Sequence, residues 1–242
     1  MSSADIAQFN KLTSKKKKSG IRLFFIMLLN MTLIICLGIV ITVYGPIIWS
    51  EVQYSYNVLF DENYKKREQE LSNIPKRLNN QEILLEPVNP IPEPQDKNFS
   101  IVIPKISVNR QVVSDVDLTN EREVAEALKH GVGWAKGTVE PGDFGNSLLF
   151  SHSARNVWDI QRYNSEFTLL DKLQIDDLFT VVYKGRQFDF IVYEKQIVPA
   201  GDISYLTSAA EGRIVTLQTC HPPGFDSNRL LVRGRLIAMQ TF

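Results

Sequence analysis

Hydropathy along the first 100 residues separates an apolar run from the polar segments around it. The run from Leu23 to Ser50 contains no charged side chain. A helix that crosses a bilayer needs about 20 apolar residues, so we expect a transmembrane helix at residues 21–49. The run exceeds the apolar core of an ordinary signal peptide and ends without a small-residue cleavage site. It therefore predicts a retained signal anchor rather than a buried core helix, which is rarely so long and uncharged.

Charge at the ends of this run predicts its orientation. Residues 1–20 form a polar tail with four consecutive lysines, Lys15 to Lys18, and Arg22 follows. Cationic flanks favour the cytoplasmic side, so we expect a cytoplasmic basic tail without fixed structure and an extracytoplasmic remainder. Lys and Arg total 27, as do Asp and Glu, and this balance gives no overall attraction to nucleic acid. We expect the bilayer to be a partner through residues 21–49, and no nucleic acid.

Residues 50–97 have the composition of a stalk. Their first part is charged and has apolar residues at loosely helical intervals, which predicts a juxtamembrane helix interrupted near Pro75. Four prolines then fall within eight residues, at positions 87, 90, 92 and 94. Proline-rich segments are extended, at about 3.1 Å per residue, and act as spacers.

Residues 98–242 change to short strands separated by turn signals. About eight strands are expected, at residues 100–106, 110–113, 146–151, 178–183, 187–192, 194–198, 213–219 and 229–238. Asn120 with Glu123 three residues later predicts the start of a short helix, and Gly131 predicts its end. Residues 154–176 are expected to be irregular or partly helical. This pattern favours an all-β domain, either a closed barrel or a sandwich, that is large enough to bury its own core.

The candidate nucleophile is a cysteine at the end of a predicted strand. Alternation through residues 214–220 places Cys220 on the polar face, and the run His-Pro-Pro-Gly stops the strand directly afterwards. The other cysteine, Cys36, lies in the apolar run, so the two should not pair. An unpaired cysteine outside the membrane is either a buried inert thiol or a reactive one. Its neighbours favour a reactive thiol.

A reactive thiol needs a base or a cation nearby, because a free cysteine with a pKa of about 8.5 is mostly protonated at neutral pH. Of the three histidines, His152 ends a predicted strand and is the best candidate. His221 is adjacent to Cys220 and should point away from it. His130 lies at a predicted helix C-terminus, where a cation interacts favourably with the helix dipole.

An arginine is the third candidate. Arg229 opens the strand that follows the cysteine, where a guanidinium could stabilise an oxyanion or hold a substrate backbone. Arg233 and Arg235 lie further along that strand and read as ordinary surface arginines.

Together these motifs resemble the sortase family. The resemblance covers residues 98–242 and is carried by Thr-Leu-Gln-Thr-Cys at 216–220, by His152, and by Arg229 opening Arg-Leu-Leu-Val. Ile-Pro-Lys-Ile at 103–106 and the glycines that precede the histidine add to it. The Cys-x-Pro-Pro-Gly continuation resembles class D and the Cys-His-Pro run resembles class E, so both subclasses stay open.

The resemblance implies a sortase-type eight-stranded β-barrel with short helices, which makes residues 98–242 the catalytic domain. It also implies a membrane-anchored cysteine transpeptidase in a Gram-positive type of envelope. Such an enzyme cleaves a Leu-Pro-x-Thr-Gly-like sorting signal through a thioester and transfers the protein to a cell-wall or pilus amine. Cys220 would be the nucleophile, His152 the acid and base, and Arg229 the oxyanion or substrate stabiliser. No cofactor and no metal are expected.

Other functions remain open. A membrane-anchored cysteine peptidase would release surface proteins by hydrolysis, and a non-catalytic anchored domain would only bind. A papain-like hydrolase places its cysteine before its histidine, which is the reverse of the order here. The Ser-His-Gly-Cys type of run found in an L,D-transpeptidase is absent.

Overall fold

The computed structural model describes residues 3–62, 66, 91–153, 166–207, 211–223 and 225–241. The chain divides into two compact units, Met1–Gly45 and Pro46–Phe242, which are described separately. Pro75 and the prolines at 87 and 90 lie outside the described residues. Residues 91–98 have no regular secondary structure apart from bends.

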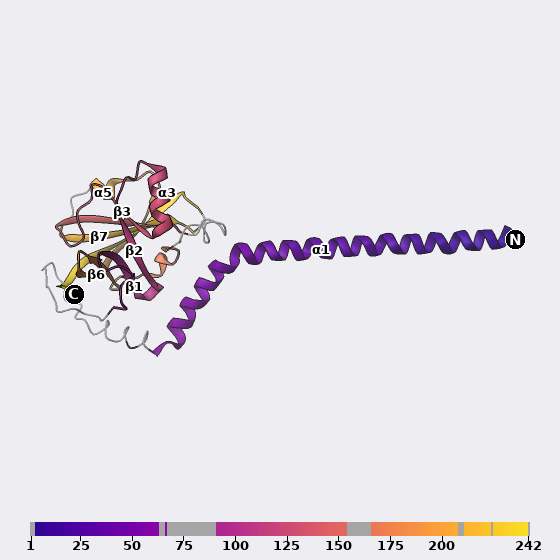
Figure 1. Ribbon diagram of the computed structural model, residues 1–242, viewed down its shortest axis with the longest axis horizontal. Coiled ribbons are helices and arrows are strands. Elements are labelled where there is room, and N and C mark those ends of the chain that lie inside the picture. Colours follow the sequence, from indigo (N-terminus) through magenta and orange to yellow (C-terminus); the bar gives the residue numbers. More distant parts are fainter. Residues whose placement is uncertain are drawn as a thin grey trace. The chain divides into compact units, whose positions relative to one another are not determined.

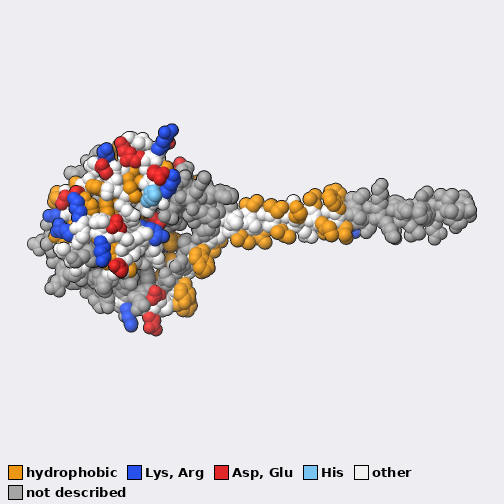
Figure 2. Space-filling view, in the orientation of Figure 1, with side chains coloured by type: hydrophobic (Ala, Val, Ile, Leu, Met, Phe, Trp, Pro, Cys, Tyr) orange, Lys and Arg blue, Asp and Glu red, His pale blue; other side chains and the backbone are white. Residues whose placement is uncertain are grey.

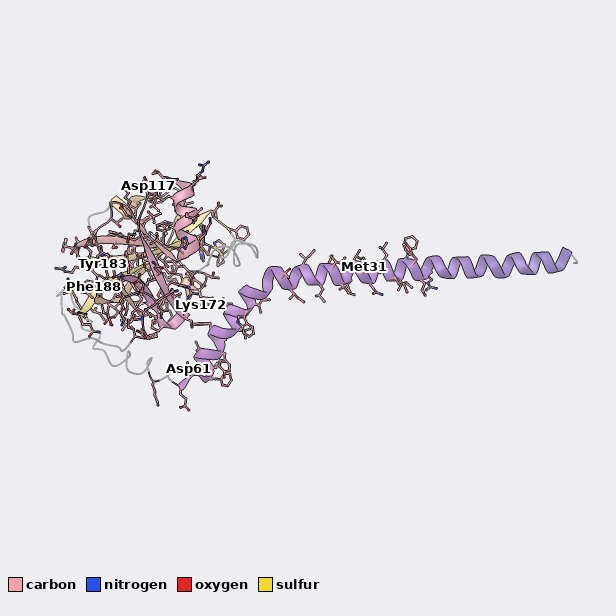
Figure 3. The ribbon with its side chains drawn as sticks, in the orientation of Figure 1. Met31, Asp61, Asp117, Lys172, Tyr183 and Phe188 are labelled. Carbon is pink, nitrogen blue, oxygen red and sulfur yellow. The ribbon has the colours of Figure 1, made fainter. Side chains whose placement is uncertain are left out.

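A long helix, α1, runs from Ser3 to Phe60. Its 21-residue segment Arg22–Thr42 is apolar and long enough to cross a membrane, by length and composition. Apolar side chains cover the exposed surface of this segment (Figure 2), and Met31 is one that projects from it (Figure 3). The expectation that residues 1–20 lack structure is wrong from Ser3 onward, because the tail continues the helix. Lysine is a good helix former, and extending an existing helix needs no new nucleus.

Eight strands form a closed barrel in the order β1–β2–β3–β4–β7–β8–β6–β5 (Figure 1). Their bounds are Phe99–Ile103 for β1, Val108–Val116 for β2, Val132–Ala135 for β3, Gly145–Phe150 for β4, Leu178–Tyr183 for β5, Arg186–Pro199 for β6, Arg213–His221 for β7 and Asn228–Thr241 for β8. The pairs β2–β3 and β4–β7 are parallel, and the other six pairs are antiparallel. This barrel, with only short helices beside it, confirms the predicted fold class.

In the described part of the chain, four short helical elements accompany the strands: η1 (Pro104–Ile106), α3 (Glu121–His130), η2 (Leu170–Lys172) and α5 (Ser204–Thr207). Helix α3 begins as the sequence predicts, because the side chain of Asn120 accepts a hydrogen bond from the backbone N–H of Glu123 at 3.3 Å. Such a cap satisfies one of the backbone donors that a helix start leaves unpaired.

The predicted strands need correction in three places. The expected strands 187–192 and 194–198 are one strand, β6, in which the register with β8 shifts between Val192 and Glu194. A bulge of this kind breaks the alternation without ending the strand. Strand β3 was not predicted, since it has only four residues, Val132–Ala135, and includes a glycine. The first strand also ends at Ile103, where η1 begins.

The core has two parts, on opposite faces of the same strands. The larger part fills the barrel and includes Leu149, Leu217 and Val232. The smaller part lies on the outer face and includes Leu148, Phe150 and Leu231, together with apolar side chains of α3 and α5. Because side chains alternate between the faces of a strand, strands β4 and β8 supply both parts of the core, whereas β7 supplies only the part inside the barrel. Because the smaller part of the core occupies much of the outer face, few positions remain there for polar side chains.

Candidate active site

Strand β7 separates apolar from polar side chains as the alternation predicts. Val215 and Leu217 are fully buried and belong to the core inside the barrel. Gln218 and Cys220 are half-buried and have the opposite parity, so they lie on the outer face of the sheet. The thiol is therefore presented outside the barrel, at the C-terminal end of β7.

Strand β8 places an arginine directly opposite this cysteine. In the antiparallel pair β7–β8, Cys220 is the register partner of Arg229. Residues directly opposite in such a pair have Cα atoms about 4.5–5.5 Å apart and side chains on the same face. The guanidinium Nη1 of Arg229 donates to the carbonyl oxygens of Asp226 at 2.9 Å and Asn228 at 3.1 Å. Among the described residues, its Nε and Nη2 have no hydrogen-bond acceptor.

His152 follows strand β4, the other neighbour of β7. The last register pair of these parallel strands is Phe150 with Gln218. The chain stays beside β7 for another residue, because the N–H of Ser151 donates to the carbonyl of Gln218 at 3.2 Å and the hydroxyl of Thr219 donates to the carbonyl of Ser151 at 3.0 Å. If the register of Phe150 with Gln218 continues for two more residues, His152 lies beside Cys220. Cys220 and Arg229 thus lie on adjacent strands, and His152 follows the strand on the other side of Cys220, at the same end of the barrel.

A later segment of the chain holds the backbone carbonyl of His152. This carbonyl accepts the backbone N–H of Phe167, at 3.3 Å, and Phe167 is fully buried in the barrel core. The neighbouring Glu166 pairs with Arg110 of β2, at 2.5 Å between carboxylate oxygen and Nε. Burial raises the pKa of this carboxyl group, and the hydrogen bond and charge of Arg110 oppose the increase.

A hydrogen-bond network that the sequence analysis missed lies on the same outer face. The hydroxyl of Tyr205, in α5, donates to Oε1 of Gln218 at 2.6 Å. The carbonyl of Tyr205 accepts from Nδ2 of Asn146 at 3.2 Å, and Oδ1 of Asn146 accepts from the hydroxyl of Thr216 at 2.8 Å. No motif marks Tyr205, since it lies in the connection between β6 and β7. Only the parity of Gln218 and Cys220 on β7 indicated that the two share a face.

Tyr205 is also electrostatically close to the candidate arginine. Burial raises the pKa of its hydroxyl, the positive charge of Arg229 opposes that increase, and Asp202 adds to it. The phenol therefore stays neutral, as a hydrogen-bond donor to Gln218.

The remaining histidines and arginines have other surroundings. His130, at the end of α3, lies 3.4 Å from a carboxylate oxygen of Glu126 and is exposed. His221 is the register partner of Asn228, and alternation directs it away from the face of Cys220. Arg233 pairs with Glu194 at 2.9 Å. Arg235 lies over the ring of Tyr193, with 5.8 Å from its Cζ to the ring centroid.

Neither cysteine forms a disulfide; Cys36 is exposed on α1 and Cys220 is half-buried. Within the described ranges, no group of three or more His, Cys, Asp or Glu residues is arranged to hold a metal ion. The three candidate residues at this end of the barrel carry a thiol, an imidazole and a guanidinium.

Solved structures with a similar fold come from several bacteria. Streptococcus agalactiae sortase C1, in complex with MTSET, is 27% identical with a TM-score of 0.49, over 57% of this chain and 66% of that one. Corynebacterium diphtheriae sortase A is 24% identical with a TM-score of 0.49, over 61% of each chain. Actinomyces oris sortase C-1 is 25% identical with a TM-score of 0.49, over 72% of this chain and 98% of that one. The chain thus spans less than two thirds of the length of the first two.

Comparison with curated proteins found no significant match. The model of the Sortase domain family matches residues 101–237, which is more than half of the 242 residues and includes all three candidate site residues. The chain belongs to the sortase family.

Proposed function

We propose that this protein is a membrane-anchored sortase, a cysteine transpeptidase that cleaves a Leu-Pro-x-Thr-Gly-like sorting signal. It transfers the acyl part to a cell-wall or pilin amine. The observation that carries the proposal is the register of β7, which has Arg229 opposite Cys220 on one side and the end of β4, with His152, on the other. Family membership supports the reaction class, and the parity of β7 supports a thiol that a peptide can reach.

In the first half of the reaction, the Cys220 thiolate attacks the carbonyl carbon of the scissile peptide bond, forming a carbon–sulfur bond and an oxyanion. The guanidinium of Arg229 donates hydrogen bonds to that oxyanion through the nitrogens that the backbone does not engage. The tetrahedral intermediate then collapses and the carbon–nitrogen bond breaks. His152, as imidazolium, gives its proton to the departing amine. The product is a thioester on Cys220 and a released C-terminal peptide.

In the second half, an acceptor amine attacks the thioester. His152, now neutral, takes a proton from the attacking amine, and the Cys220 thiolate leaves. Charge and protons balance over the cycle, so no cofactor is required. Water in place of the amine would give hydrolysis, and the fate of the thioester is therefore the point that separates a transpeptidase from a peptidase.

We assign the remaining parts of the chain as follows. Residues 1–20 are a cytoplasmic basic tail, residues 21–49 a signal anchor, residues 50–97 an extracytoplasmic stalk, and residues 98–242 the catalytic domain. The apolar segment Arg22–Thr42 supports the anchor, and the lysines that precede it support a cytoplasmic N-terminus. The barrel would then face the cell wall, where both sorting signals and acceptor amines are found.

The test is incubation of the protein with internally quenched Leu-Pro-x-Thr-Gly peptides, with and without an amine nucleophile such as triglycine. Products are identified by mass spectrometry. We expect wild type to give the ligated product when the amine is present, and Cys220→Ala to give none. A covalent adduct with the mass of the acylated chain should form on wild type alone. Equal turnover by the two proteins would rule out a thioester at Cys220, and product that is only hydrolysed would support the peptidase.

A further inference from the structure

Gln218 lies two residues before Cys220, on the same face of β7. Its Oε1 accepts the Tyr205 hydroxyl at 2.6 Å, which leaves the amide nitrogen without an acceptor among the described residues. The nitrogen is not among the buried unpartnered atoms, so it reaches solvent. A half-buried donor beside a reactive thiol is a position where a substrate acceptor would bind.

Tyr205 determines which end of this amide is free. A tyrosine hydroxyl that donates to Oε1 holds the Gln218 side chain with its NH₂ group directed elsewhere. Tyr205 is itself restrained, because it is 6% exposed, its ring packs in the outer core cluster, and its carbonyl accepts a hydrogen bond from Asn146. The direction of the free donor is therefore set by a packed side chain and needs no rearrangement when a ligand binds.

The spacing of the two side chains matches an extended peptide. Residues two apart on a strand are separated by about 6.6–6.8 Å and point to the same face. An extended peptide has the same repeat, so its carbonyls two residues apart also point the same way. If a peptide lies along β7 with its scissile carbonyl at Cys220, a second carbonyl, two residues away, comes level with Gln218.

We propose that Gln218 is a substrate-recognition residue, whose amide nitrogen, oriented by Tyr205, donates a hydrogen bond to a backbone carbonyl of the sorting peptide two residues from the scissile bond. This inference rests on the proposed function, since it takes the cleaved ligand to be an extended peptide. Gln218 contacts the substrate directly, whereas Tyr205 is a positioning residue that acts through Gln218.

Three variants and a matched control test the proposal. Gln218→Met keeps the length of the side chain and removes its hydrogen bonding. Tyr205→Phe keeps the ring in its core cluster and removes only the hydroxyl. The double variant closes a thermodynamic cycle. The control is Gln196→Met: Gln196 is an exposed glutamine of β6 that faces Leu231 in register, and Leu231 in turn faces Gln218. It lies in the same row of the outer face, two strands away from β7.

The measurement is steady-state kinetics with an internally quenched Leu-Pro-Glu-Thr-Gly peptide and triglycine, together with binding of that peptide to each variant in a Cys220→Ala background. For Gln218→Met we expect kcat/KM to fall by about threefold to tenfold, the range of one neutral hydrogen bond. The fall should come mainly through KM, with weaker peptide binding by the same factor, since a remote carbonyl changes little in the transition state. Tyr205→Phe should give a smaller loss of the same kind.

The cycle is decisive for Tyr205, because its loss should disappear when Gln218 is already methionine. Gln196→Met should behave as wild type. Wild-type kinetics for Gln218→Met would overturn the inference while leaving the transpeptidase assignment intact, and so would a loss confined to kcat. Additive effects in the cycle would overturn the positioning role of Tyr205. A wild type that neither binds nor cleaves the peptide would overturn the inference and the proposed function together.

Discussion

The inner and outer faces of strands β4, β7 and β8 differ although the same strands build them. Inside the barrel, consecutive inward positions such as Val215, Leu217 and Val232 are apolar and fully buried. Outside, the apolar positions Leu148 and Leu231 are covered by α3 and α5, and at the strand ends they give way to half-buried polar groups. We therefore expect stability to depend mostly on the inner face. On the outer face, the same hydrogen-bonded strands fix the positions of the polar side chains.

The largest effect should come from truncating the inner face. Leu217→Ala removes a fully buried side chain, and Leu-to-Ala changes in cores cost about 2–5 kcal/mol of unfolding free energy. Gln218→Ala, the adjacent residue on the outer face, should cost less than about 1.5 kcal/mol, because its side chain is half-buried and loses one hydrogen bond. Urea unfolding of the isolated barrel, residues 91–242, followed by intrinsic fluorescence, compares the two. Similar costs would show that the faces share the stabilising role.

Arg229→Ala should have a smaller effect when expressed as a free energy. It should lower the rate of the reaction and leave the stability of the fold unchanged. Loss of one oxyanion donor typically lowers the rate 10²–10³-fold, and we expect at least about a tenfold fall in kcat/KM for the sorting peptide with unfolding unchanged. Arg233→Ala is the matched control, four residues along β8, and it loses only a partly exposed ion pair with Glu194. Equal kinetics for the two variants would remove Arg229 from the mechanism.

The smallest effect is a pH dependence that comes from another polar group, Asp189 of β6. Its side chain is buried and accepts hydrogen bonds from Thr180 at 2.6 Å and from the Gln187 amide at 2.9 Å. Burial raises the pKa of this carboxyl group above its ordinary value, and the hydrogen bonds from Thr180 and Gln187 oppose the increase.

The sign of the effect follows from proton binding. Between the unfolded and folded pKa values the native state holds the proton more tightly, so the free energy of unfolding falls as pH rises through this window. Asp189→Asn should remove that part of the slope. Urea unfolding of both proteins from pH 3.5 to pH 8 measures it, and parallel curves for the two proteins would mean that Asp189 titrates alike in both states.

Alternation along single strands explains what the sequence predicted well. It assigned the two faces of β7, the hairpin of β5 and β6 with its turn at Lys184 and Gly185, which both have positive φ, and the start of α3. It failed where a strand is too short to show a period, as in β3, or contains a bulge, as in β6. The prediction omitted β3 and divided β6 into two strands. These two errors cancel, so the predicted number of strands was still eight.

The candidate site depended on information of a different kind. Nothing local specifies that β4 pairs with β7, or in which register, because that pairing joins residues about 70 positions apart. Only the resemblance to sortases assigned His152 a place beside Cys220, whereas Arg229 was a candidate because it opens the strand that follows the cysteine; the roles of both remain predictions. Tyr205 could not be found in this way, since its part in the network depends on how α5 packs against the outer face.

The position of β8 has a consequence for how the barrel forms. This strand follows β6 and β7 in the chain but lies between them, hydrogen-bonded to both. A chain made from its N-terminus therefore carries two open sheet edges until β8 arrives, and open edges invite pairing with other chains. Insertion of β8 closes the sheet and brings Arg229 opposite Cys220 in the same event, so a partly synthesised chain has the thiol but lacks the arginine beside it.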